Sequence, residues 1–345
     1  MKELDIVSLY KTMYFSRRFE EEVKKYWEQG LISAEMHMGI GEEAIYAGVL
    51  SHLIDGDAIA LDHRGTGPML IRGVDPVALM LEFLGHPKGI CGGYGGHMHM
   101  FSKEFSMASS GIVGSSGPAA VGFALALQYK KTKNIAVAFF GEGSTNQGMM
   151  LESFNLAAVW NLPVLFFCKS NKWAITTPSK EVTNAPLIAR ALGFGLDCAE
   201  IDGTDVVAVW QAAKESIEKI RAESKPYFIL AHCEHKEGHF LGDPLLRFHK
   251  TSGEAFGQVL GPLTNSITRF KGASLLKRTA SLSKILSLIA QAKDQTRDKH
   301  DPFIKARKQL EKDKEKLKLI ELEVESNIQK ILKSVEQIIE RRENQ

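Results

Sequence analysis

The chain has 345 residues, enough for one large or two ordinary cores, and its 44% hydrophobic and 24% charged residues are typical of a soluble globular protein. Its formal net charge of +2 gives no footprint for nucleic acid, and no apolar run reaches the length of about 18 residues that a membrane-spanning helix needs. The four cysteines show no metal or redox spacing, and the N-terminus is too charged for a secretory signal. We therefore expect a cytoplasmic protein with no nucleic-acid and no membrane partner.

The first predicted element is an amphipathic helix that ends at Gly30. Its apolar residues recur at helical spacing: Leu9, Met13, Phe19, Val23 and Trp27. Charged residues fill the other face, and a glycine suits the position just after a helix.

Three short apolar runs further along the chain predict the strands of a buried sheet. They are Ile135–Phe140, Val164–Phe167 and Tyr227–Ala231. Continuous apolar runs are typical of strands that are buried on both faces of a parallel sheet. Between the first two runs, Met149–Trp160 has a helical pattern, which completes a βαβ unit. The sequence therefore predicts an α/β fold with a parallel sheet flanked by helices.

The character of the sequence changes after Asp243. Between Pro244 and His300 the basic residues outnumber the acidic ones, and an amphipathic helix is predicted from its leucine and isoleucine spacing: Leu275, Leu282, Leu286 and Ile289. The charged stretch Leu310–Ile339 has one apolar face, which predicts a long surface helix or a short coiled coil. We expect a main domain at residues 1–243, a basic insertion at 244–300 that is either an interaction segment or a solvated insertion, and a helical C-terminal arm at 301–345.

Polar and glycine residues follow two of the predicted strands. The turn after the first strand contains Gly141, Glu142, Gly143 and Ser144, and the second strand is followed by Asn171 and Trp173. Ligands of open α/β sheets bind beyond the carboxyl ends of the strands. The carboxylate of Glu142, the side-chain oxygen of Asn171 and a backbone carbonyl, which we assign to Trp173, would suit Mg²⁺. The glycines would let a diphosphate approach backbone N–H groups.

These two segments together resemble the thiamine-diphosphate motif, in which Gly-Asp-Gly is followed after about thirty residues by Asn-Asn. The surrounding sequence, GEGSTNQG…ESFNLAAVWNLPVLFF, looks like the alpha subunits of pyruvate, branched-chain 2-oxoacid and acetoin dehydrogenases. The resemblance covers about residues 6–243 and resumes near Asp301. It implies a thiamine-diphosphate-binding fold that holds thiamine diphosphate and Mg²⁺.

The resemblance also implies roles for residues outside the two strand ends. His37 corresponds to a family histidine that faces the reacting cofactor, and His239 to a loop histidine that reaches the diphosphate and closes over the site. We expect both to be catalytic, and His239 to bind the cofactor as well. Arg64 would pair with the diphosphate, since its planar fork grips phosphate oxygens, and His63 stands beside it where relatives have Tyr or His.

The resemblance further implies that the loop at Gly111 and Val113 holds the aminopyrimidine ring. His97, His99 and His235 match no such family position, and we predict structural roles for them.

Four positions depart from the family pattern. Glu142 replaces the usual Asp, Ser170 replaces the first Asn, Lys169 stands where relatives usually have Glu, and Thr66 stands where many have His. The longer Glu142 arm either still reaches Mg²⁺ or is replaced in its function by Lys169, which would then approach the diphosphate as a point charge.

The function implied by the resemblance is that of an alpha subunit in a heterotetramer of two alpha and two beta chains. Such enzymes oxidatively decarboxylate a 2-oxoacid, here most simply pyruvate, and pass the acyl group to the lipoyl arm of an acyltransferase component. The beta chain supplies the glutamate that activates the aminopyrimidine. Two alternatives are an acetoin dehydrogenase alpha subunit and a degenerate subunit that scaffolds such a complex without turnover.

Overall fold

The computed structural model describes residues 3–33, 35–242 and 298–343, together with scattered residues between 274 and 291. The helices are α1 (Ile6–Glu28), α2 (Glu43–Leu50), α3 (Thr66–Arg72), α4 (Pro76–Phe83), α5 (Ser116–Tyr129), α6 (Gly148–Val159), α7 (Leu187–Gly193), α8 (Val206–Glu223), α12 (Pro302–Gln309) and α13 (Lys314–Glu343). The strands are β1 (Ala58–Leu61), β2 (Phe101–Ser102), β3 (Met107–Ser109), β4 (Ala136–Gly141), β5 (Val164–Ser170), β6 (Trp173–Ala174), β7 (Thr177–Pro178), β8 (Asp197–Asp202) and β9 (Tyr227–His232). Short 3₁₀ helices lie at η1 (Glu142–Asn146), η2 (Ser179–Glu181), η3 (Asp298–His300) and η4 (Glu311–Asp313).

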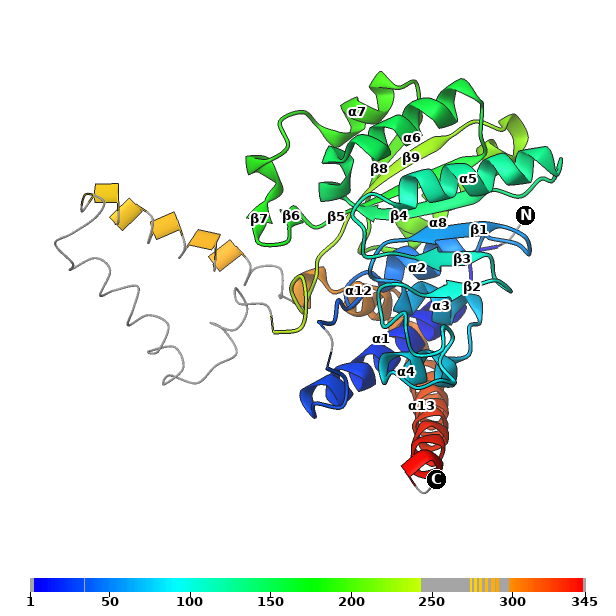
Figure 1. The fold of residues 1–345 in the computed structure, drawn as a ribbon, viewed down its shortest axis with the longest axis vertical. Coiled ribbons are helices and arrows are strands. Elements are labelled where there is room, and N and C mark those ends of the chain that lie inside the picture. The colour runs from blue at the N-terminus through cyan, green and yellow to red at the C-terminus, as the bar shows by residue number, and fades with distance from the viewer. Residues whose placement is uncertain are drawn as a thin grey trace.

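A seven-stranded sheet with the order β2-β3-β1-β4-β5-β9-β8 forms the centre of the molecule (Figure 1). All neighbouring strands are parallel except β2 and β3 at one edge, which are antiparallel. The three strands predicted from apolar runs are confirmed as β4, β5 and β9, and each extends further at its carboxyl end, as far as Ser170 in β5. The predicted α/β fold with a parallel sheet flanked by helices is confirmed.

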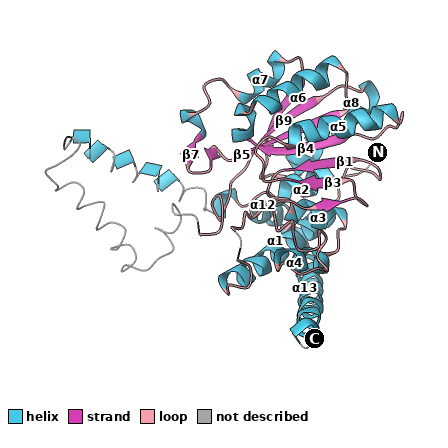
Figure 2. Cartoon of the chain, in the orientation of Figure 1, coloured by secondary structure: helices cyan, strands magenta, loops and turns pink. Residues whose placement is uncertain are grey.

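Both faces of this sheet are covered by helices, which explains why its strands are apolar without alternation (Figure 2). Along β4, Val137 and Phe139 belong to one core, which they share with α1, α2 and α8. Their neighbours Ala138 and Phe140 point to the opposite face and pack with α5, α6 and α7. A charge anywhere in β4 would therefore be buried against one core or the other.

The N-terminal helix and the C-terminal arm pack against each other. α1 ends at Glu28, and Gly30 follows with a φ of +76°, the left-handed conformation that favours glycine at a helix end. The apolar face of α13 packs against α1 and α4, and it contributes six residues to the same core as α1: Leu317, Ile320, Val324, Ile328, Ile331 and Val335. Of the two predictions for this segment, a long helix packed on the surface is confirmed.

Asp301 fastens the arm to the main body of the chain. Its carboxylate accepts the N–H of Phe303 at the start of α12, and it forms ion pairs with Arg17 at 3.1 Å and with Lys236 at 2.6 Å. Because Lys236 lies in the loop after β9, this contact also ties the arm to the segment that carries His239.

The helix predicted from Leu275, Leu282, Leu286 and Ile289, and most of the basic insertion, lie outside the described residues. Among the helices that the structure describes, none is both long and apolar enough to cross a membrane.

Candidate active site

The turn after β4 and the end of β5 form the first part of the site. Gly141 pairs with Lys169 in the sheet register, so Glu142 and Asn171 emerge beside each other where the two strands end. The Glu142 carboxylate is buried, and it accepts hydrogen bonds from the Ser179 hydroxyl at 2.8 Å and from the Asn171 N–H at 3.4 Å. Burial raises its pKa. The Glu142 carboxylate therefore contacts the backbone of Asn171, the second residue predicted to bind the metal.

A cavity of about 480 Å³ opens beside this carboxylate. Its lining includes Glu142, Ser170, Lys172, Trp173 and Ser179. Among the described residues, no lysine or arginine forms an ion pair with Glu142. A buried carboxylate beside a polar cavity suits a bound cation.

The contact that Trp173 makes with this cluster uses its N–H group, which donates to the Asn171 side-chain oxygen at 3.1 Å. Gly143 is close to β6, because a Cβ atom there would lie 3.2 Å from the Ala174 Cβ. Gly141 is less crowded, and a Cβ there would approach only the Lys169 carbonyl, at 3.9 Å. Ser144 is buried in the same turn. Packing against β6 therefore explains why a glycine is needed at position 143, whereas packing within the chain does not explain the glycine at position 141.

A chain of buried hydrogen bonds runs inward from Asn171. Its side-chain amide donates to His235 Nδ1 at 2.8 Å, and the opposite ring nitrogen, Nε2, lies 2.7 Å from a carboxylate oxygen of Glu42. Burial lowers the pKa of His235 to about 4, so the ring is neutral and Nε2 carries its single proton. Glu42 therefore fixes the His235 tautomer, and His235 in turn fixes the orientation of the Asn171 amide.

Lys169 lies at the inner end of this chain. Its ammonium group is 2.8 Å from Glu42, 2.9 Å from Asp62 and 2.6 Å from the Tyr46 hydroxyl. Burial alone would lower the pKa of Lys169, but Asp62 and Glu42 outweigh it and raise that pKa. Burial would likewise raise the pKa of Glu42, but Lys169 and His235 hold it well below its usual range. All three ammonium protons have a partner, which contradicts the hypothesis that Lys169 contacts the diphosphate directly.

A second cluster consists of histidines from four separate loops. The His97 Nε2 atom lies 3.1 Å from the backbone N–H of His37 and 3.0 Å from His37 Nδ1. A backbone N–H can only donate, so His97 Nε2 is an unprotonated acceptor and His37 Nδ1 must carry the proton. The His37 Nε2 atom is then left with its lone pair. His97, which we predicted to be structural, therefore sets the tautomer of His37.

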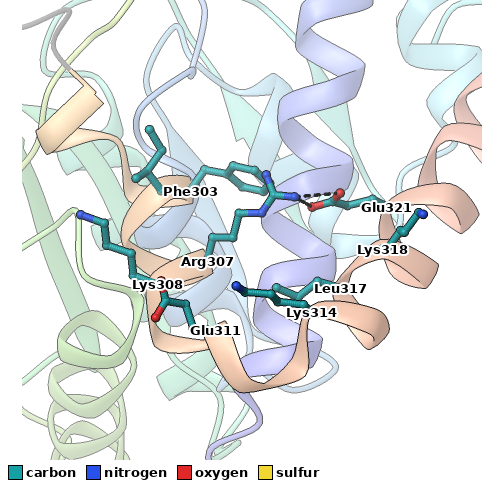
Figure 3. Close-up of a pocket in the computed structure, with 9 residues that line it drawn as sticks. Phe303, Arg307, Lys308, Glu311, Lys314, Leu317, Lys318 and Glu321 are labelled. Carbon is teal, nitrogen blue, oxygen red and sulfur yellow. Dashed lines mark hydrogen bonds and ion pairs between the residues drawn. The ribbon is translucent and has the colours of Figure 1, made fainter.

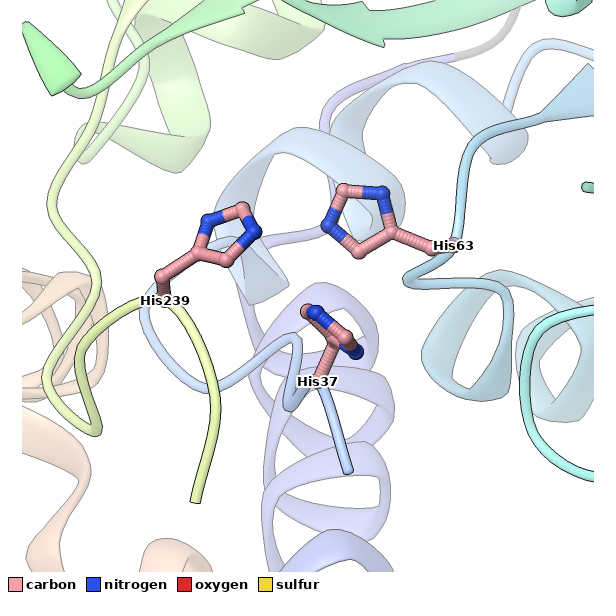
Figure 4. A group of neighbouring side chains, drawn as sticks. All are labelled: His37, His63 and His239. Atoms are coloured by element: carbon pink, nitrogen blue, oxygen red, sulfur yellow. The ribbon is translucent and has the colours of Figure 1, made fainter. Parts of the chain in front are cut away.

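His37, His63 and His239 surround a common space (Figure 4). The ring centroids of His37 and His63 are 4.5 Å apart, those of His37 and His239 5.0 Å, and those of His63 and His239 5.3 Å. Burial, with Arg64 as the next cause, lowers the pKa of His37 to about 2 and that of His239 to about 3, and it also lowers the pKa of His63. All three rings are neutral at pH 7.

Arg64 is buried and close enough to the three histidines to lower their pKa values. Its guanidinium donates to the backbone carbonyl of His239 at 2.8 Å and to that of Met38. It thus links the loop after β1 to the loop after β9.

The predicted aminopyrimidine loop lies near the strand-end turn. A Cβ at Gly114 would lie 3.1 Å from Gln147, the residue that follows η1, so the two segments touch. Gly111 is crowded by Met98, at 3.0 Å from the position of a Cβ. Val113 is half exposed in the single chain.

Another groove, of about 630 Å³, lies between α12 and the start of α13 (Figure 3). Phe303 and Leu317 line it, and an ion pair between Arg307 and Glu321, at 2.9 Å, crosses it. It shares no residue with the predicted site.

Comparison with known proteins is consistent with this geometry. The sequence matches the family described as "Dehydrogenase E1 component" over residues 11–255. It is 40% identical over 248 residues to the alpha subunit of acetoin:2,6-dichlorophenolindophenol oxidoreductase from Bacillus subtilis, covering 71% of this chain and 74% of the relative. It is 36% identical over 242 residues to the pyruvate dehydrogenase E1 component subunit alpha from Rhizobium meliloti, covering 70% of each chain.

The match spans more than half of the chain, and the relatives are alpha subunits of two of the three enzyme types that the sequence around the strand ends resembles, those acting on acetoin and on pyruvate. The resemblance stated from the sequence is confirmed, and the chain belongs to the dehydrogenase E1 component family.

Proposed function

We propose that this chain is the alpha subunit of the decarboxylating component of a 2-oxoacid dehydrogenase complex, with pyruvate as the substrate. In this proposal it oxidatively decarboxylates the 2-oxoacid together with a beta subunit. The acyl group passes to a lipoyl arm on an acyltransferase component. Thiamine diphosphate, when bound, supplies the electron sink for the decarboxylation.

The buried pair of Glu142 and Asn171 at the strand ends is the observation that carries this proposal. The carboxylate has no basic partner among the described residues, and the cavity beside it has room for a diphosphate. Mg²⁺ prefers hard oxygen ligands, usually one or two carboxylates together with phosphate oxygens and waters. We propose that Glu142, the Asn171 side-chain oxygen and the Trp173 carbonyl hold this ion, and that Gly141, Gly143 and Ser144 border the diphosphate.

The neutral histidines provide the groups that act on the substrate. His37 presents an unprotonated Nε2 because His97 holds its proton at Nδ1. A neutral imidazole in this tautomer accepts a hydrogen bond or a proton from a substrate oxygen. His239 lies across the same space, on the loop that Arg64 and Lys236 anchor. We propose that both histidines act during acyl transfer, and that His63 and Arg64 bind the cofactor.

Apolar side chains near the site support a requirement for a second subunit. Tyr94 is 96% exposed, Ile112 62% and Val113 50%, and all three belong to the glycine-rich loops beside the site. We propose that a beta subunit covers this face in a heterotetramer, and that Gly111 and Val113 then contact the aminopyrimidine. We place the assembly in the cytoplasm.

A second candidate function is favoured by one observation. The alpha subunits of acetoin:2,6-dichlorophenolindophenol oxidoreductase from Bacillus subtilis and Cupriavidus necator are each 40% identical to this chain, against 36% for the pyruvate dehydrogenase subunit from Rhizobium meliloti. An acetoin-cleaving enzyme would use the same cofactor site. The scaffold alternative gains no support from the site, because the departures at Glu142 and Lys169 are both accommodated by partners in the chain.

The test is dye reduction by the co-expressed alpha–beta assembly with thiamine diphosphate and Mg²⁺. We expect turnover with a 2-oxoacid, highest with pyruvate, and none with the alpha chain alone. Turnover with acetoin but not with pyruvate would favour the second candidate. Full activity of the alpha chain as a monomer would contradict the need for a beta subunit, and inactivity with every substrate would favour the scaffold.

A further inference from the structure

Glu82, near the end of α4, is a buried carboxylate that the proposed reaction does not use. Among the described residues, no lysine or arginine forms an ion pair with it, and backbone N–H groups of the glycine-rich loop at residues 89–96 surround it instead. Its Oε2 atom accepts the N–H groups of Cys91 at 2.8 Å and Gly93 at 2.9 Å, and Oε1 accepts that of Gly95 at 2.7 Å. The loop therefore folds around this side chain as other loops fold around a bound anion.

The glycines of this loop are required by its close approach to α4 and to the residues that follow it. A Cβ atom at Gly89 would lie 2.3 Å from Glu82 Oε2, and one at Gly93 would lie 2.5 Å from the Gly85 carbonyl carbon. Because glycines lose more conformational freedom on folding than other residues, a loop rich in them depends on specific bonds to keep one shape. Hydrogen bonds to a carboxylate are roughly twice as strong as those between neutral groups, so the three bonds to Glu82 supply that order.

The loop leads directly into His97, the residue that sets the tautomer of His37. Glu82 holds the N–H of Gly95, two residues before His97. The Gly95 carbonyl accepts the N–H of His99 at 3.1 Å, so the backbone on both sides of His97 is tied to one residue. The His97 ring in turn places Nε2 3.1 Å from the backbone N–H of His37 and 3.0 Å from its Nδ1 atom. A chain of contacts thus connects α4 to a histidine that we propose acts on the substrate.

We propose that Glu82 is a positioning residue, whose carboxylate holds the glycine-rich loop so that His97 keeps the proton of His37 on Nδ1. Glu82 acts on the reaction through this loop, as an outer residue that fixes the orientation of an inner one. Its effect on turnover rests on the proposed function, whereas its effects on the loop and on the His37 tautomer do not.

The first test is the ¹⁵N spectrum of the His37 ring in the full-length alpha chain, labelled at histidine and without cofactor. Glu82→Gln has the same size but only one acceptor oxygen, so its NH₂ group would face at least one of the three N–H groups. We expect the single tautomer of the parent chain to become a mixture. Asp205→Asn is the matched control, because it also replaces a carboxylate that accepts two backbone N–H groups, at the start of α8, and it should keep the parental tautomer.

A second test reads the loop itself through Tyr94, which is 96% exposed and lies between two of the glycines that Glu82 holds. Chymotrypsin cleaves after exposed aromatic residues where the backbone opens locally. Cleavage after Tyr94 should be about tenfold faster in Glu82→Gln, because the loss of a bond to a charged group makes opening easier. Cleavage after Tyr129, which is 79% exposed at the end of α5, is the internal control and should keep the parental rate.

In the alpha–beta assembly with thiamine diphosphate and Mg²⁺, kcat of Glu82→Gln should fall roughly three- to tenfold, and KM should change less. Circular dichroism shows whether each variant is folded. Glu82→Asp, which withdraws the carboxylate by about 1.5 Å, is the second variant should Glu82→Gln fail to fold.

A parental His37 tautomer, or a parental rate of cleavage after Tyr94, in a folded variant would overturn the proposal. Mixed tautomers and faster cleavage would support it even if the parent alpha–beta assembly turned over no substrate. Failure of this inference is therefore distinguishable from failure of the proposed function.

Discussion

The strand-end turn and the histidine loops both lie at the carboxyl ends of the parallel strands, but different features of the fold position them. Glu142 and Asn171 are positioned by the register of two adjacent parallel strands. His37, His63, His97 and His239 come from four loops that are far apart in sequence and are joined by contacts among themselves and with Arg64. The comparison teaches that the first region depends on the sheet, whereas the second depends on a layer of buried polar contacts.

The largest expected effect belongs to the strand-end region. Glu142→Ala should abolish Mg²⁺-dependent binding of thiamine diphosphate to the alpha–beta assembly, because it removes the buried carboxylate that contacts Asn171 and that we propose as a metal ligand. Glu142→Asp should retain binding. Ser179→Ala is a matched control that removes one hydrogen bond to the same carboxylate and should have a smaller effect. Isothermal calorimetry measures all three, and parental affinity in Glu142→Ala would contradict this assignment.

The next largest effect is expected from the buried ion pairs of Lys169 with Glu42 and Asp62. Lys169→Met would leave Glu42 and Asp62 without their cation, and removing one partner of a buried ion pair costs about 3–5 kcal/mol. We expect the free energy of unfolding in urea to fall by about this amount. Lys11→Met, which breaks an exposed pair with Glu323, should change it little. Similar unfolding curves for the two variants would show that the Lys169 network is not structural.

The smallest effect is expected from the histidine loops. His97→Phe removes the acceptor that holds the proton on His37 Nδ1, so the two His37 tautomers should mix and kcat should fall by about tenfold or more. KM should change less. His97→Gln keeps an acceptor oxygen and should restore most of the activity. The ¹⁵N chemical shifts of the His37 ring report the tautomer directly, and shifts that are the same in both variants and the parent would refute a positioning role.

The sequence predicts the strand-end region well because its geometry is local. The apolar runs that form β4 and β5 place Glu142 and Asn171 at strand ends, and parallel register brings strand ends together. The same logic extends to the amphipathic pattern of α13, whose apolar face lies on α1 as expected for a helix with one buried side. In each case a repeating pattern identifies the buried face before any contact is known.

The histidine layer was predicted only in part, and for a physical reason. The family resemblance predicts site roles for His37 and His239, whereas His97 and His235 are predicted to be structural, because nothing in their local sequence shows what a loop will contact. Lys169 does not contact the predicted diphosphate position as hypothesised. It pairs with Glu42 and Asp62, because a buried ammonium group pairs with the carboxylates that the fold brings near. One signal in the sequence points to a site role for His97, namely its spacing of two residues from His99 beside a glycine-rich loop.

One titration tests the central claim, that this chain carries a working half of a thiamine-diphosphate site. The purified alpha–beta assembly is titrated with thiamine diphosphate by calorimetry, with and without Mg²⁺. The site at Glu142 and Asn171 predicts one cofactor bound per alpha chain, with an affinity that depends on Mg²⁺. No binding in excess Mg²⁺ would contradict the claim and leave the chain as a scaffold.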